Sequence, residues 1–193
     1  MAIVYIVRHG NTFDAGDIIR RVGRGTDLPL SQSGQAQAAA LGQALADVAF
    51  DKALVSPLLR TRMTADAILS TQTVPPKPHY DDRLIEIDYG PDEGAPETDV
   101  IQRLGSDAIE AWDKDAIVPS GWQVDPDALT SAWRDLLGAA TGTVLIVTSN
   151  GVARFVLDVA AHDGVARKLK TGAYGRLEGE GEDWRVRDWN IRP

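Results

Sequence analysis

The chain opens with the run Ala2-Ile3-Val4-Tyr5-Ile6-Val7, which leads directly into Arg8-His9-Gly10. The first six residues are mostly β-branched or aromatic, a composition typical of a buried strand. In open α/β sheets, ligands bind beyond the carboxyl ends of the strands. A ligand could therefore approach closely at this point, because the glycine lets the backbone turn. Arg8 can bind a phosphate or a carboxylate through its fork of donors, and His9 can act as a nucleophile.

Two later segments repeat the pattern of a short apolar run followed by polar residues. Lys52–Val55 precedes Ser56-Pro57, and Thr143–Val147 precedes a run that starts at Thr148. Ser56 suits an N-cap and Pro57 a first helical position, which predicts a helix over 58–69. Nearly continuous apolar strands that alternate with helices indicate a parallel sheet covered on both faces. We therefore expect an α/β fold, a three-layer α/β/α sandwich with a mostly parallel central sheet.

Helical composition predicts most of the remaining elements. Residues 35–48 are rich in alanine, leucine and glutamine and follow the cap candidates Ser31 and Ser33. We expect three further helices, over 98–112, 126–137 and 152–161. Two edge strands are expected over 173–177 and 184–189, and two loops over 14–29 and 74–78. The five tryptophans are interpreted as core or edge-packing residues.

The bulk composition narrows the class of protein. The chain has 193 residues, 44% hydrophobic and 25% charged, which favours one globular domain over 1–193. Its net charge of −8 argues against nucleic acid or an anionic membrane as a partner. Because there is no cysteine, disulfides, thiolate catalysis and cysteine-ligated zinc are excluded.

The sequence also bears on location and assembly. The apolar run before Arg8 is too short for a signal peptide and lacks a basic leader, and no run reaches the length of a membrane span. We therefore predict a cytoplasmic protein. No interface signature is evident, so a homodimer stays open as an assembly.

Four motifs carry the candidate chemistry. In chain order they span 7–12, 27–36, 56–65 and 83–94. Together they resemble the histidine phosphatase superfamily, the group that includes cofactor-dependent phosphoglycerate mutase, and the resemblance extends from Val4 to about Asn190. It implies a phosphoglycerate mutase-like fold and a reaction that needs no metal. We expect no cofactor for this chain.

The resemblance also implies catalytic roles. His9 would attack phosphorus and form a phosphohistidine that water then cleaves. Arg8 and Arg60, expected at the ends of two neighbouring strands, would neutralise the transferring phosphoryl group. The alternative for Arg60 is a solvated helix arginine. Glu86 aligns with the family's general acid, which protonates the departing alkoxide.

Other residues are candidates for substrate binding. Asn11 and Thr12 could donate hydrogen bonds to the phosphate. Arg21 and Arg24 belong to an arginine-rich loop that either shapes substrate choice or is simply solvated. A solvated loop is also the preferred interpretation of the acidic residues that could otherwise form a metal site, Asp81, Asp82 and Asp88.

One departure from the family pattern concerns its second histidine. The family has a segment reading roughly Ser-His-Gly-Gly-Val, and Ser149 occupies the position of that histidine here. Ser149, Asn150 and the backbone amides that follow still offer donors for a phosphate. A lost charge-assisted contact is worth roughly 1.5–3 kcal/mol, so we expect attenuated turnover. His79, interpreted as a strand or surface residue, and His162, interpreted as a C-terminal helix residue, are not placed to substitute.

The leading functional hypothesis is a metal-independent phosphatase that hydrolyses a small phosphate monoester and releases inorganic phosphate. A phosphoglycerate mutase-type phosphoryl transferase is one alternative. Mutases of this type usually have a longer chain, so the compact length here favours hydrolysis. A catalytically weak phosphoester-binding or regulatory protein is another, in which Ser149 would mark lost turnover. Glu86 favours an enzyme, because a pure binding protein needs no general acid. Protein-phosphohistidine phosphatases are shorter and typically lack the segment around Glu86.

Overall fold

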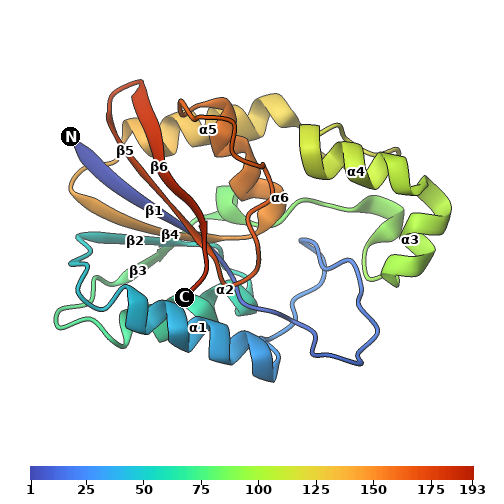
Figure 1. Cartoon of the computed structure of the whole chain (residues 1–193), viewed down its shortest axis with the longest axis horizontal. Helices are drawn as coiled ribbons and strands as arrows, with labels where there is room; N and C mark the ends of the chain where they lie inside the picture. Colours follow the sequence, from blue (N-terminus) through green and yellow to red (C-terminus); the bar gives the residue numbers. More distant parts are fainter.

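A six-stranded sheet forms the middle layer of the computed structural model, which describes all 193 residues (Figure 1). The strand order is β3-β2-β4-β1-β5-β6. The first four of these strands are parallel, namely β3 (Pro78–Tyr80), β2 (Lys52–Val55), β4 (Thr143–Thr148) and β1 (Ala2–Arg8). The antiparallel pair at the other side is β5 (Tyr174–Glu180) and β6 (Asp183–Ile191). The predicted α/β fold with a mostly parallel sheet is confirmed.

Helices cover both faces of this sheet. One face carries α1 (Gln32–Ala44) and α2 (Leu59–Leu69), and the other carries α5 (Pro126–Gly138) and α6 (Asn150–Ala153) (Figure 1). Two more helices, α3 (Glu97–Leu104) and α4 (Ser106–Asp115), extend beyond the sheet near the loop over 11–30. Short 3-10 helices span Asp82–Leu84, Gly90–Asp92 and Arg154–Asp158. None of the helices is both long enough and apolar enough to cross a membrane.

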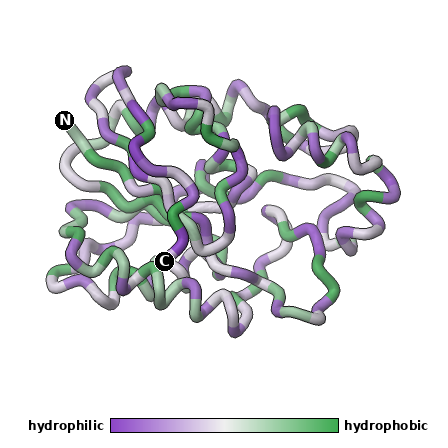
Figure 2. The backbone as a smooth tube through the Cα atoms, in the orientation of Figure 1, coloured by the Kyte–Doolittle hydropathy of each residue, from purple (hydrophilic) through white to green (hydrophobic).

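The two-faced core follows from alternation along the strands. In β4, Val144 and Ile146 pack in the cluster that contains Trp133 of α5. Leu145 and Val147 point to the opposite face and join the α1–α2 cluster. The central strands are accordingly hydrophobic along most of their length in Figure 2. The tryptophans pack as predicted, since four of the five are buried and Trp189 is half-buried.

Two predicted helices are wrong in extent. The helix expected over 98–112 is two helices, because Gly105 adopts a left-handed φ of 85° between them. The helix expected over 152–161 is only the four-residue α6, followed by the 3-10 turn over Arg154–Asp158. Residues 154–157 are all buried, so tertiary packing overrides local helix propensity there.

The helix starts show which caps are local. Ser31 caps α1 as predicted, accepting from the Gly34 amide at 3.2 Å, although that helix ends at Ala44 rather than at 48. The cap predicted at Ser56 is wrong, because α2 begins at Leu59. The carboxylate of Asp27, a distant loop residue, accepts from the Leu59 amide at 2.6 Å. A tertiary contact therefore does what the local motif was expected to do.

The strand order corrects three further expectations. β1 and β2 are not neighbours, because β4 lies between them. β5 is not an edge strand, since β1 and β6 flank it, whereas β6 is at the edge as predicted. The proline-rich connector leads into a fourth parallel strand, β3, in addition to the three predicted from apolar runs. Strand order depends on pairing between distant segments, which local patterns do not encode.

The first turn of α1 packs unusually close to the loop after His9. A Cβ added to Gly34 would lie 2.0 Å from the Asn11 carbonyl oxygen, and one added to Gly10 would lie 2.3 Å from the Gly34 carbonyl oxygen. The absence of side chains at both glycines therefore sets the position of the loop against the helix.

We predict that Gly34→Ala lowers the free energy of unfolding by about 2 kcal/mol, since the backbone must shift to admit the methyl group. Urea denaturation measures this effect. Gly138→Ala is the matched control, because a Cβ there meets nothing within 4 Å and its φ is not positive. Equal urea midpoints for Gly34→Ala and the wild type would contradict the packing argument.

Candidate active site

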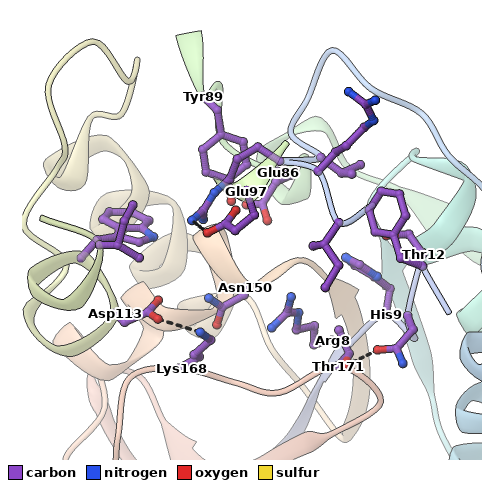
Figure 3. A pocket seen from close by; sticks show the side chains of 18 of the residues that line it. Arg8, His9, Thr12, Glu86, Tyr89, Glu97, Asp113, Asn150, Lys168 and Thr171 are labelled. Carbon is purple, nitrogen blue, oxygen red and sulfur yellow. Dashed lines mark hydrogen bonds and ion pairs between the residues drawn. The ribbon is translucent and has the colours of Figure 1, made fainter. Parts of the chain in front are cut away.

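A cavity of about 490 Å³ lies beyond the carboxyl end of β1 (Figure 3). Its walls come from the loop after β1, the helices α3 and α4, the start of α6 and the segment before β5. Seven residues predicted from the sequence line it, namely Arg8, His9, Asn11, Thr12, Arg21, Glu86 and Asn150. The fold thus brings together motifs that are far apart in the chain.

His9 is buried, with 7% of its surface exposed, and its orientation is determined by one hydrogen bond. Its Nδ1 lies 2.7 Å from the carbonyl oxygen of Gly10. Because a carbonyl can only accept, Nδ1 carries the proton and the lone pair is on Nε2. Burial, and then the charges of Arg60 and Arg8, lower the pKa of His9 well below its ordinary value of 6.5. The imidazole is therefore neutral and able to act as a nucleophile at Nε2.

Arg8 lines the same cavity and has a donor without a partner. Its Nη1 donates to the Leu169 carbonyl at 2.8 Å, whereas its buried Nε has no hydrogen-bond partner. Burial lowers the pKa of Arg8, but a guanidinium stays protonated in proteins. The cation therefore contributes a permanent positive charge beside His9.

Arg60 lies behind the cavity and does not line it. Its Nη1 donates to the Thr26 carbonyl at 2.9 Å, and its Nη2 donates to the carbonyls of Gly23 at 3.1 Å and Val22 at 3.3 Å. Its Nε is buried without a partner. The side chain is fully buried, so the interpretation of Arg60 as a solvated arginine is wrong. It secures the loop over 22–26 and adds positive charge near His9.

Glu86 is 5% exposed and is held by two backbone amides. Its Oε1 accepts from the Ile87 amide at 3.0 Å, and its Oε2 accepts from the Gly151 amide at 3.3 Å. A Cβ on Gly151 would lie 2.2 Å from Oε1, so the glycine makes room for the carboxylate. Beside it, burial and then the charge of Glu86 raise the pKa of Tyr89, which keeps that phenol neutral.

Thr148, a fully buried threonine at the end of β4, joins the motifs. Its carbonyl accepts from the His9 amide at 3.2 Å, and its hydroxyl donates to the Leu84 carbonyl at 2.7 Å. Since Ser149 follows it directly, Thr148 connects His9, the segment that carries Glu86 and the start of α6.

The polar side chains of the cavity floor are also organised. Asn11 accepts from the Thr171 hydroxyl at 2.6 Å through Oδ1 and donates to the Ser33 hydroxyl at 3.1 Å through Nδ2. Asn150 accepts from the Leu169 amide at 2.9 Å. These contacts hold the loop after β1 and the start of α6 against the segment before β5.

Ser149, at the position of the family's second histidine, is fully buried at the N-cap of α6, and its hydroxyl has no partner. It does not line the cavity surface. Neither of the other histidines lines it either, because His79 is exposed on β3 and His162 lies after the last 3-10 turn. The interpretation of His162 as a C-terminal helix residue is wrong, because that turn ends at Asp158.

The structure separates the two arginines predicted from the loop. Arg21 lines the cavity and forms an ion pair with Glu97. Arg24 lines a different cavity, of about 320 Å³, together with Asp88 and Gln123. The backbone amide of Arg24 donates to the Ile87 carbonyl at 3.1 Å, which ties that part of the loop outside the main site. The expectation that Arg24 binds substrate in this cavity is therefore wrong.

Several lining residues had no signal in the sequence. Glu97 and Asp113 come from α3 and α4, and Lys168 and Thr171 come from the segment before β5. Only the folded chain places these elements around His9. The structure contains no group of three or more histidine or acidic side chains able to hold a metal ion. Asp81 instead forms an ion pair with Arg83.

Comparison with known proteins identifies the family. The sequence matches the histidine phosphatase superfamily (branch 1) over residues 4–192. The chain belongs to this superfamily. The family member "Uncharacterized phosphatase PhoE" of Bacillus subtilis (strain 168) is 27% identical over 197 residues, covering 99% of this chain and 95% of that protein. The mouse "Fructose-2,6-bisphosphatase TIGAR" is 43% identical over 94 residues, but the match covers 47% of this chain and only 34% of that protein.

Solved histidine phosphatase folds superpose closely on this one. A mycobacterial glucosyl-3-phosphoglycerate phosphatase superposes with a TM-score of 0.80 at 19% identity over the whole of both chains, which supports the fold alone. A protein of Thermus thermophilus, TTHB049, superposes with a TM-score of 0.69 at 29% identity, covering 97% of this chain and 98% of that one. The family's architecture is thus present along the full length.

The lowered pKa of His9 predicts a pH dependence of stability. A histidine that is neutral when folded binds its proton only on unfolding, so its stabilising effect is present above pH 6.5 and is lost as the pH falls below that value. Relative to His9→Gln, the wild type should lose up to about 1.4 kcal/mol of unfolding free energy per pH unit below 6.5. Urea denaturation at several pH values measures this difference. Parallel curves for the two proteins would show that His9 is not held neutral.

Proposed function

We propose that the protein is a metal-independent phosphatase of the cytoplasm that hydrolyses a small phosphate monoester through a phosphohistidine on His9. One observation carries the proposal, namely the neutral His9 whose Nε2 is available in a cavity also lined by Arg8 and Glu86. These are the nucleophile, the phosphate-binding cation and the acid that phosphoryl transfer to an imidazole requires. Small-molecule esters are the proposed partners, rather than nucleic acid or a membrane.

In the first step, Nε2 of His9 attacks phosphorus and the bond from phosphorus to the ester oxygen breaks. A proton that Glu86 takes up when the dianionic phosphate binds beside it passes to the departing oxygen, which leaves as an alcohol. Arg8, which lines the cavity, balances the charge on the phosphoryl oxygens through its guanidinium. The nucleophile needs no prior deprotonation, because the pKa of His9 is already low.

In the second step, Glu86 accepts a proton from a water molecule that attacks the phosphohistidine. The bond from nitrogen to phosphorus breaks, and inorganic phosphate leaves with His9 neutral again. Lys168 at the cavity is about half exposed, so water has access to the intermediate. This access supports hydrolysis rather than transfer back to a second alcohol, as a mutase requires.

Ser149 supports a reduced rather than an absent activity. Its buried hydroxyl has no partner, as is also true of Nε in Arg8 and in Arg60. Buried donors normally find acceptors, and of these three residues only Arg8 lines the cavity, so Arg8 is the candidate to bind phosphoryl oxygens when substrate is present. A serine hydroxyl is neutral, however, and stabilises a developing charge less than a charged donor does.

We predict that His9→Ala abolishes turnover of an activated aryl phosphate and of a panel of metabolite phosphates, assayed in chelator. The wild type should release phosphate, and the variant should fall at least about 10³-fold, because the covalent route is lost. Residual activity near the wild-type level would refute a phosphohistidine on His9. Wild-type silence across the panel, with esters still bound, would favour a phosphoester-binding protein.

Glu86→Gln tests the acid separately. The amide keeps the size of the side chain but has no proton to give. We predict a loss of about 10²-fold on alkyl phosphates, whose alkoxides leave poorly, and a much smaller loss on 4-nitrophenyl phosphate, whose leaving group needs no proton. Rates on both substrates provide the measurement. Equal losses would mean that Glu86 does not protonate the leaving group.

A further inference from the structure

Away from Arg8, His9 and Glu86, the cavity carries balanced charge. This outer part has three basic and three acidic side chains, namely Arg20, Arg21, Lys168, Asp14, Glu97 and Asp113. We infer that it selects phosphate monoesters whose alcohol is uncharged, and discriminates against esters that carry a second phosphate or a carboxylate. The inference rests on the proposed function, because it concerns the leaving group of the same site.

Arg21 is held by a carboxylate and two aromatic rings. It forms an ion pair with Glu97, and the exposed fraction of its side chain is only 15%. Its Cζ lies 5.5 Å from the ring centroid of Tyr89 and 5.2 Å from that of Trp122. To bind a second anion, Arg21 would have to exchange these contacts for weaker ones. Its charge is therefore balanced by Glu97, although its buried Nε has no hydrogen-bond partner.

The charge of Lys168 is likewise balanced by a carboxylate. Its Nζ lies 2.6 Å from Oδ2 of Asp113 (Figure 3). The other oxygen of Asp113 lies 3.5 Å from a guanidinium nitrogen of Arg154, which is fully buried and stacked 4.1 Å from the ring centroid of Trp112. Because Arg154 and Lys168 hold Asp113 in place, a substrate anion at Lys168 would also face the carboxylate.

The two remaining charged residues of the outer cavity, Asp14 and Arg20, do not create a positive field. Hydrogen bonds from Ser33 lower the pKa of Asp14 to about 2, so that carboxylate stays ionised. Arg20 is exposed, has no ion-pair partner and donates to the Gly94 carbonyl at 3.0 Å. One solvated cation on a chain of net charge −8 attracts a second anion weakly.

The rest of the wall favours an alcohol with apolar surface. Six of the lining side chains are apolar or aromatic and large, namely Phe13, Ile19, Val22, Tyr89, Ile109 and Trp112. Such walls bind carbon-rich or ring-shaped groups through burial, with hydroxyls meeting the polar side chains between them. Of the two half-buried cations that line the cavity, Arg8 and Arg21, only Arg8 has no carboxylate partner, so the transferring phosphate is the anion that the cavity can neutralise best.

Two esters with the same carbon chain test the selectivity. Glycerol 3-phosphate ends in a hydroxymethyl group and 3-phosphoglycerate in a carboxylate. We expect His9→Ala to bind glycerol 3-phosphate at least about tenfold more tightly by calorimetry, because the added carboxylate meets acidic neighbours. Equal affinity, or tighter binding of 3-phosphoglycerate, would overturn the inference. Binding to this variant is independent of turnover.

Charge-removing variants identify the source of the selectivity. Glu97→Gln and Asp113→Asn each leave a cavity cation without its counter-charge. We expect each to raise the ratio of kcat/KM for 3-phosphoglycerate over glycerol 3-phosphate about fivefold, the size of an ion-pair effect at a partly exposed site. Glu182→Gln, an exposed site outside this cavity, is the matched control and should leave the ratio unchanged.

An unchanged ratio in both cavity variants would overturn the assignment of selectivity to these carboxylates. Failure of the proposed function gives a different result. In that case the wild type hydrolyses neither ester, although His9→Ala still binds glycerol 3-phosphate more tightly than 3-phosphoglycerate.

Discussion

The site depends on the parallel pairing of β1 with β4, and in particular on Thr148 at the end of that pairing. The backbone of Thr148 accepts from His9, and its hydroxyl donates to the segment that carries Glu86. Parallel strands end at the same edge of a sheet, so the residues after each strand converge there. One buried residue thereby sets His9, Glu86 and the start of α6 relative to one another.

A second constraint is the neutrality of His9. Burial, and then the guanidinium charges of Arg60 and Arg8, lower the pKa of the imidazole and suppress its protonation. The cluster of His9, Arg8 and Arg60 therefore carries two positive charges rather than three. The Nε2 of His9 keeps its lone pair. The same cations that would bind the phosphoryl group therefore prepare its nucleophile. The hydrogen bond to Gly10 decides which nitrogen performs that role.

The outer part of the cavity differs from the part near His9 in how its cations are paired. Near His9, Arg8 and Arg60 form no ion pair with a carboxylate, whereas Arg21 and Lys168 each pair with one. These carboxylates come from α3 and α4, which extend beyond the sheet. In the proposed reaction, the groups that would bind the phosphate lie near the strand ends, and those that would select the alcohol lie on helices outside them.

Local patterns were enough to predict the sheet class, the buried first strand and the residues that follow it. Apolar runs of the right length end at Arg8 and at Thr148, and burial on both faces of a sheet requires such runs. Ser31 capped its helix because that contact spans three residues. The motifs also indicated His9, Arg8 and Glu86 as members of one site, all of which line the cavity.

Tertiary structure decided what depends on contacts between distant residues. The cap of α2 comes from Asp27, β4 inserts between β1 and β2, and Arg24 is tied outside the cavity while Arg21 lies within it. The partners of Arg21 and Lys168 lie 76 and 55 residues away in the chain. A sequence pattern records which side chains are present and their local spacing. Which charges remain free for a ligand is decided only when the folded chain brings those charges together, because the interaction energy depends on distance and burial.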